Sequence, residues 1–163
     1  LYENNISLSG YHLPLDFHEK IGNNIILSDI LKLSKIQFFK SDFYIKGKNS
    51  RSYSITDIKK MLDDFLGVVS IIHNFTGRNT PENIAICSGG GGSVIKRLAN
   101  KDIDLFITGE IKENEYKEAM EINMNIIRLG HYYSERTGIK KLTEMLKSKY
   151  NLNASFIDID NPY

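Results

Sequence analysis

The chain has 163 residues, 41% of them hydrophobic and 25% charged, and its formal net charge at pH 7 is +1. This composition is that of an ordinary globular domain, and the balanced charge gives no electrostatic reason to expect a polyanionic partner. The single cysteine, Cys87, excludes an intramolecular disulfide, and no apolar run reaches the roughly 18–20 residues of a membrane span. We therefore expect a soluble, cytoplasmic protein without membrane contact.

The chain begins at Leu1 without a methionine, and residues 6–11 alternate in the manner of a strand almost from the start. We expect further residues upstream in the natural gene product and treat the chain as a fragment. In the first half, apolar periodicity and turn residues predict strands over 6–11 and 68–75, a pair of strands within 36–48, and helices over 25–33 and 56–66, with Thr56 as the N-cap of the second helix.

The second half alternates strands with helices. Strands are predicted over 84–87, 104–108, 125–129 and 154–159, and helices over 93–100, 113–122 and 133–150. Strands separated by helices at this spacing form βαβ units. The sequence therefore predicts an α/β fold with a mixed, largely parallel sheet flanked by helices.

Two pairs of residues have the chemistry of metal ligands. His131 and Glu135 are four apart at the start of a predicted helix, so their side chains share one face. His12 and Asp16 are four apart in a loop that Pro14 stiffens. Each pair alone is also compatible with an ordinary cap or turn, because such spacings are common by chance.

Other candidate residues follow predicted strands, where open α/β sheets collect their functional groups. Glycines 89–92 can bring backbone N–H groups close to an anion or substrate, or can simply make a tight turn. Glu110 is compatible with a site acid, a partner of a ligand, or a helix-start carboxylate. Cys87 is expected in the core. The aromatic and basic residues between Phe38 and Lys60 offer little support for nucleic-acid binding, because acidic residues interrupt them.

Six motifs resemble one known family in order and approximate spacing, over nearly the whole chain. They are Ser9–Asp16, Gly22–Asn24, Cys87–Gly90, Ile107–Glu110, Gly130–Glu135 and Ser155–Pro162. In these motifs the chain is similar to the Nif-three-like family, whose members are often labelled GTP cyclohydrolase I type 2 homologues.

The resemblance implies a two-lobed α/β fold with a pair of divalent metal ions in a cleft, and commonly a homohexameric ring. It places residues 1–35 and 83–163 in the metal-cleft lobe and residues 36–82 in a smaller α/β insertion. It implies that Asp16, His131 and Glu135 are metal ligands, with Glu135 bridging two ions, and that His12 lies at the edge of the site. The family's N-terminal portion, with its His-His motif, is absent from this sequence.

Two functions are compatible with these features. The first is a metal-dependent hydrolase acting on a nucleotide-like small molecule, with His12 or Glu110 moving protons and Gly89, Gly90 and Gly91 approaching the substrate. We expect two ions per full-length chain, and mixed nitrogen and oxygen ligands suit Zn, Mn, Fe, Ni or Mg. The second is a non-enzymatic metal-binding regulatory or scaffold protein.

Overall fold

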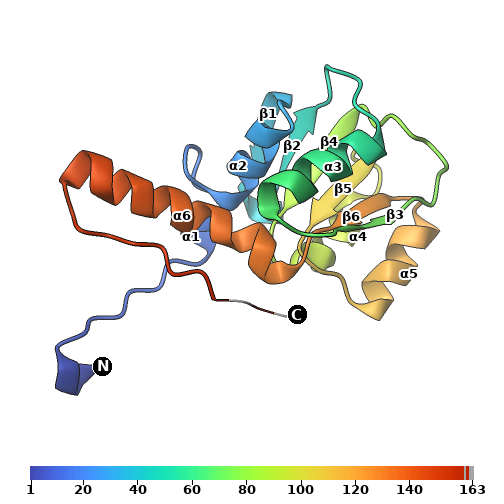
Figure 1. Cartoon of the computed structure of the whole chain (residues 1–163). Coiled ribbons are helices and arrows are strands. Elements are labelled where there is room, and N and C mark those ends of the chain that lie inside the picture. The colour runs from blue at the N-terminus through green and yellow to red at the C-terminus, as the bar shows by residue number, and fades with distance from the viewer. Residues whose placement is uncertain (160, 162–163) are drawn as a thin grey trace.

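Figure 1 shows a computed structural model of the chain, which describes residues 1–159 and 161. Six strands in this part of the chain are β1 (Ser34–Phe39), β2 (Tyr44–Lys48), β3 (Ile71–His73), β4 (Asn83–Cys87), β5 (Leu105–Thr108) and β6 (Asn125–Arg128). The α-helices are α1 (Leu13–Asp16), α2 (Asn23–Ile30), α3 (Ile55–Leu66), α4 (Ile95–Leu98), α5 (Glu113–Glu121) and α6 (His131–Tyr150). Short 3-10 turns cover Tyr2–Asn4, Lys40–Asp42 and Gly91–Val94.

The six strands form one sheet in the order β1-β2-β4-β5-β6-β3. The mixed α/β class is confirmed, but the expectation of a largely parallel sheet is wrong. Only β4–β5 and β5–β6 pair in parallel, whereas β1–β2, β2–β4 and β3–β6 are antiparallel. Residues 40–43 join β1 to β2, and so short a connection can only make an antiparallel hairpin. The sheet takes strands from both expected segments, and the division into two lobes stays a prediction.

Helices cover both faces of the sheet, and alternate residues of the central strands point to opposite layers. Ile84 and Ile86 of β4 pack with side chains of α2 and α3, whereas Ala85 lies in the cluster that α4 and α5 complete on the other face. All three side chains are fully buried. The helix α6 extends well beyond the sheet edge (Figure 1). No helix among the described residues has both the length and the apolar character needed to cross a membrane.

The helix ends follow local capping chemistry. Ser54, rather than the expected Thr56, is the N-cap of α3, where it forms a capping box with Asp57. Gly67 ends this helix with φ +67°, in the left-handed region that glycine adopts without steric cost. The helix α6 begins two residues earlier than predicted, so His131 lies in its first turn.

Two predicted strands are wrong. Residues 6–11 and 154–159 have no regular structure; the N-terminal segment projects away from the rest of the molecule, and the segment after α6 returns outside the sheet (Figure 1). Alternation of apolar residues is not sufficient for a strand, because its backbone groups also need a neighbouring strand. The strand expected over 68–75 is limited to Ile71–His73, where β6 offers pairing partners. Residues 160 and 162, in the last of the family motifs, lie outside the described residues.

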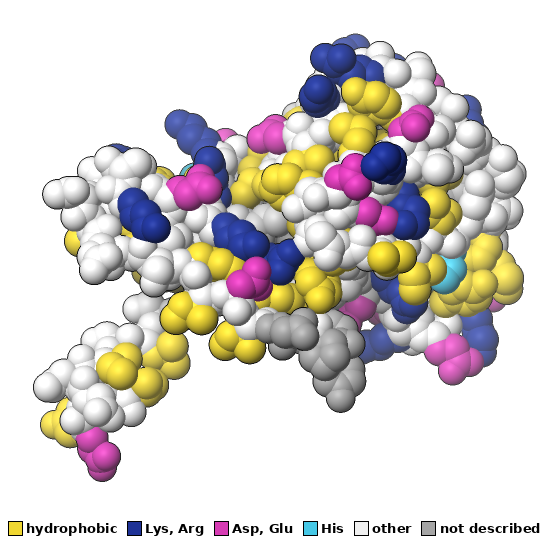
Figure 2. Space-filling view, in the orientation of Figure 1, with side chains coloured by type: hydrophobic (Ala, Val, Ile, Leu, Met, Phe, Trp, Pro, Cys, Tyr) yellow, Lys and Arg dark blue, Asp and Glu magenta, His cyan; other side chains and the backbone are white. Residues whose placement is uncertain are grey.

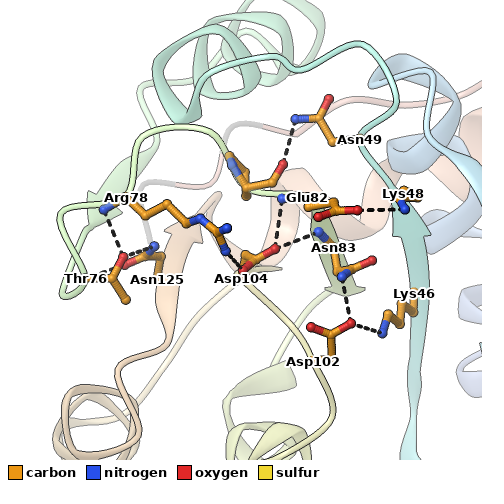
Figure 3. A network of polar contacts seen from close by, with 11 residues as sticks. Lys46, Lys48, Asn49, Thr76, Arg78, Glu82, Asn83, Asp102, Asp104 and Asn125 are labelled. Carbon is orange, nitrogen blue, oxygen red and sulfur yellow. Dashed lines mark hydrogen bonds and ion pairs between the residues drawn. The ribbon is translucent and has the colours of Figure 1, made fainter.

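Polar contacts hold the amino ends of the parallel strands together (Figure 3). The carboxylate of Asp104, just before β5, accepts hydrogen bonds from the backbone N–H of Glu82 and Asn83 at 2.8 and 2.9 Å and pairs with Arg78. Lys48 forms an ion pair with Glu82 at 2.7 Å. The charged side chains at this end of the sheet are thus paired with one another. The candidate site residues lie at the other end, where the parallel strands end.

Candidate metal centre

The candidate site lies at the carboxyl ends of the three parallel strands. In the sheet, Cys87, Thr108 and Arg128 end neighbouring strands in matched register. The loops that follow these residues must therefore emerge side by side. They carry the glycine turn, Glu110 and His131, three separate parts of the sequence that the topology brings to one edge.

The first turn of α6 presents His131 and Glu135 together. Gly130 precedes the helix with φ +90°, a conformation that lets the chain reverse sharply from β6 into α6. The side chains then lie one turn apart on one face, and His131 Nε2 is 3.3 Å from Glu135 Oε2.

The short helix α1 brings a second pair to the same place. His12 is the residue before α1, and Asp16 is the last residue of it. His12, Asp16 and Glu135 each offer one ligand atom, and these three atoms lie within 4.8 Å of one another. Glu135 is thus close both to His131 and to the His12–Asp16 pair, so it is the member that the two groups share.

The surroundings of Glu135 and His131 shift the pKa values of both side chains. Burial and the nearby Asp16 carboxylate raise the pKa of Glu135, against the opposing effect of the two histidines. Burial lowers the pKa of His131, but its hydrogen bond with Glu110 and the charge of Glu135 outweigh that effect, and the net pKa is raised. A cation bound beside Asp16 and Glu135 would favour the ionised form of Glu135, which burial and Asp16 now disfavour.

Glu110 contacts His131 rather than the carboxylates. Its Oε1 is 3.0 Å from His131 Nδ1, on the side of the ring opposite to Nε2. A carboxylate on one ring nitrogen fixes the tautomer and leaves the other nitrogen as a ligand. Of the roles considered for Glu110, the geometry favours that of a partner that orients His131.

Buried amides tie the site to its scaffold, a role that we did not assign to them from the sequence, although Gly22–Asn24 is one of the family motifs. Asn23 Nδ2 donates a hydrogen bond to Asp16 Oδ1 at 2.7 Å, while Asn23 Oδ1 accepts from Thr137 Oγ1 and from the backbone N–H of Gly138. Ser88 Oγ also donates to Asp16 Oδ1, at 3.3 Å. Because both bonds end on Oδ1, the other oxygen of Asp16 is available to a cation. The signal in the sequence was the tandem of asparagines after Gly22.

The glycine turn packs its backbone directly against the site. A Cβ on Gly89, which has φ +63°, would lie 1.9 Å from Glu135 Oε1, and one on Gly91 would lie 2.6 Å from Thr108 Oγ1. The backbone N–H of Gly89 donates to Ser134 Oγ at 2.9 Å, which links the turn to α6. At Gly90 the nearest atoms would be 3.7 Å away, on Glu110 and His131. A side chain would thus fit at Gly90, whereas the absence of one at Gly89 and Gly91 lets Glu135 and Thr108 pack against the backbone of the turn.

The predicted residues His12, Asp16, Glu110, His131 and Glu135 are therefore brought together, with Gly89 and Gly90 beside them. The sequence profile of the Duf34/NIF3 (NGG1p interacting factor 3) family matches residues 1–162. The chain belongs to this family.

Known proteins of the family resemble the chain over nearly its whole length. A GTP cyclohydrolase 1 type 2 homolog of Yersinia pestis is 37% identical over 99% of the chain, and one of Haemophilus influenzae is 34% identical. The solved structure of protein ybgI, described as of unknown function, is 33% identical with a TM-score of 0.90 and matches 99% of the chain. TTHA1606 from Thermus thermophilus is 28% identical with a TM-score of 0.82 over 93% of the chain.

The relatives are longer than the chain. The chain spans 65% of the Yersinia pestis relative and 66% of the Haemophilus influenzae relative, and 65% and 60% of the two solved structures. The Duf34/NIF3 chain thus corresponds to about two thirds of the length of these relatives.

Proposed function

We propose that this Duf34/NIF3 chain provides part of a divalent-metal site, and that the full-length protein is a metal-dependent hydrolase acting on a nucleotide-like substrate. The observation that carries the proposal is the position of Glu135. Its carboxylate is 3.3 Å from His131 Nε2 and also within 4.8 Å of ligand atoms of His12 and Asp16, and such a shared carboxylate is suited to bridge two ions.

The residues present fit such ions. Asp16, His131 and Glu135 offer one imidazole and two carboxylates, a donor set that suits Zn, Mn, Fe, Ni or Mg, and His12 lies at its edge. The contact of Glu110 with Nδ1 directs Nε2 of His131 toward the cluster. We expect two ions per full-length chain, with the remaining ligands supplied by water or by residues outside this chain.

When bound, a divalent ion supplies Lewis acidity and an activated water nucleophile. The residues of the chain then have separate tasks. Asp16, held by Asn23 and Ser88, fixes one side of the site, and Glu110 fixes the ring of His131 on the other. His12 is exposed and adjoins the carboxylates, so it is placed to exchange protons with solvent. Gly90 leaves space for the substrate to approach the backbone.

The nucleotide-like substrate is supported by the names of the relatives. Several curated relatives at 33–37% identity are named GTP cyclohydrolase 1 type 2 homolog. That name refers to a reaction on a purine nucleotide, and we propose the broader class for this chain.

Substitution of Glu135 tests both halves of the proposal. In the full-length protein, Glu135→Gln should lower bound metal, measured by elemental analysis, and abolish hydrolysis of a nucleotide and phosphoester panel. Glu144→Gln, an exposed position on the same helix, is the matched control. A wild-type preparation without metal even after soaking would refute the metal site. Metal without turnover above the Glu135→Gln variant would refute the hydrolase and favour the non-enzymatic alternative.

We also propose that the full-length protein assembles as a homohexamer. Large apolar side chains are exposed along the N-terminal segment, including Leu1, Tyr2, Ile6, Leu8 and Tyr11 (Figure 2). Exposed apolar surface of this kind marks interaction sites. Light scattering on the full-length protein should give six times the monomer mass, and a monomeric mass would contradict the proposal.

A further inference from the structure

A cavity of about 350 Å³ adjoins the candidate metal centre. His12, Asp16, His131 and Glu135 line part of it, and Phe17 and Phe43 contribute aromatic surface elsewhere. The cavity is therefore continuous with the site at which the proposed chemistry would occur. The residues that line the rest of the cavity therefore determine which substrates it can accept.

The aromatic part of the wall is partly exposed to solvent. Phe17 and Phe43 pack edge to face with centroids 6.1 Å apart, and Phe43 is 38% exposed. A ring held by an edge contact and open to solvent offers an apolar surface against which a flat ligand can stack.

Arg97 of α4 lies over the ring of Phe43, next to the residues that line the cavity, and has no carboxylate partner among the described residues. Its guanidinium carbon is 6.0 Å from the centroid of Phe43, and no ion pair involves it within residues 1–159 and 161. Its neighbour Lys96, by contrast, pairs with Glu118 at 2.9 Å. Burial raises the pKa of the Cys87 thiol in the cavity wall to about 12, and Arg97 is the cation that opposes this rise. Arg97 thus lies near the cavity wall at Phe43 and Cys87.

Asn24 adds a donor without a partner. It is fully buried and lines the cavity, and its Oδ1 accepts a hydrogen bond from the backbone N–H of Ser88 at 2.8 Å. Its Nδ2 has no hydrogen-bond partner among the described residues. A buried donor left unpaired is costly, and an acceptor atom of a ligand, directly or through a water, would satisfy it.

We propose that this cavity binds the non-reacting end of the substrate, a flat ring that stacks on Phe43 and bears a phosphate or carboxylate that pairs with Arg97. The proposal rests on the proposed function, because it gives the substrate class of the same site. Guanidinium groups pair with both anions through two parallel hydrogen bonds, so Arg97 selects for negative charge and Phe43 for a planar ring. Asn24 supplies the third contact, to an acceptor on the ring or anion.

Binding of small matched probes tests this assignment without any turnover. We would measure the affinity of phenylphosphonate, benzoate and neutral benzamide for the metal-loaded full-length protein by calorimetry or NMR. Wild type should prefer one or both anions to benzamide, and Arg97→Gln should weaken anion binding by about 10–100-fold while leaving benzamide unchanged. Phe43→Leu should weaken all three probes alike.

Arg51→Gln is the matched control, since Arg51 is exposed like Arg97 but makes no contact with the ring of Phe43. Equal anion affinity in Arg97→Gln and Arg51→Gln would overturn the proposal, as would failure of wild type to bind any probe. Phenylphosphonate and benzoate distinguish a phosphate from a carboxylate as the preferred group. Metal content measured in the same samples separates this proposal from the proposed function. If Arg97→Gln loses its preference for anions but keeps its metal, the result concerns the role of Arg97 and not the metal site.

Discussion

The side-chain amide of Asn23 donates a 2.7 Å hydrogen bond to Asp16 and so joins the start of α2 to the end of α1. The same amide accepts hydrogen bonds from Thr137 and Gly138 of α6, at 3.0 and 2.6 Å. Asn23 is 2% exposed. One buried residue therefore sets the distance between the two helices that carry the candidate ligands Asp16 and Glu135.

Asn23→Ala is expected to weaken both the fold and the metal site. It removes the three buried hydrogen bonds of the Asn23 amide to Asp16, Thr137 and Gly138, which should lower the free energy of unfolding by about 2 kcal/mol or more. It also removes one of the two hydrogen bonds that hold the Asp16 carboxylate, and loss of such an orienting partner typically lowers metal affinity about 10–100-fold. Denaturant unfolding and metal titration measure the two effects. Asn114→Ala, at an exposed position of α5, should change neither, and equal behaviour of the two variants would contradict this role.

Substitution by alanine should destabilise the protein at Gly89 but not at its neighbour Gly90. Gly89→Ala places a Cβ 1.9 Å from Glu135 Oε1 at a left-handed φ, so it should displace the carboxylate and cost about 1–2 kcal/mol from the backbone alone. Gly90→Ala has 3.7 Å to the nearest atoms and should leave unfolding unchanged within about 0.5 kcal/mol. Thermal melts and metal content of both variants check the contrast. Equal losses would mean that the turn is not packed as described.

The sequence predicted most of the elements that position the site, because their signals are local. Apolar periodicity located β4, β5, β6 and α6, and Gly130 marked the turn that carries His131. The errors came where a partner decides the structure. Residues 6–11 alternate like a strand but have none to pair with among the described residues, and the antiparallel edges of the sheet depend on how β1, β2 and β3 meet the central strands.

The sequence pointed to the candidate ligands but not to the residues that hold them in place. His131 and Glu135 share a helix face by spacing alone, whereas their approach to His12 and Asp16 depends on how α1 packs on α6. Asn23 and Ser134 have no spacing that marks them, because their partners are 114 and 45 residues away in the chain. Arg97 was missed for a similar reason: its unpaired charge is visible only once the ion pairs of its neighbours are known.

The Cys87 thiol should be unreactive in the folded protein. Burial raises its pKa to about 12, and the side chain is 8% exposed, so little thiolate is present and reagents have poor access. Iodoacetamide at pH 8 should label Cys87 only after denaturant is added, as measured by mass spectrometry of its peptide. Rapid labelling of native protein would contradict the buried position.

The same raised pKa predicts a loss of stability in alkali. Because the thiol ionises at lower pH in the unfolded chain than in the folded protein, the free energy of unfolding should fall as pH rises past 9, by about 2 kcal/mol at pH 10.5.

His73 should make the protein less stable in mild acid. Burial lowers its pKa, assisted by the charge of Arg128, and its ring packs against Phe75 and Tyr116, with Nε2 unpartnered among the described residues. The folded pKa is thus below the unfolded value of about 6.5, and the unfolded state takes up more protons as pH falls through that value. His73→Phe keeps an aromatic ring and removes the titration. The variant should therefore gain stability relative to wild type between pH 8 and pH 5, measured by denaturant unfolding in metal-free buffer. A stability difference that does not change with pH would show that His73 titrates as it does in the unfolded chain.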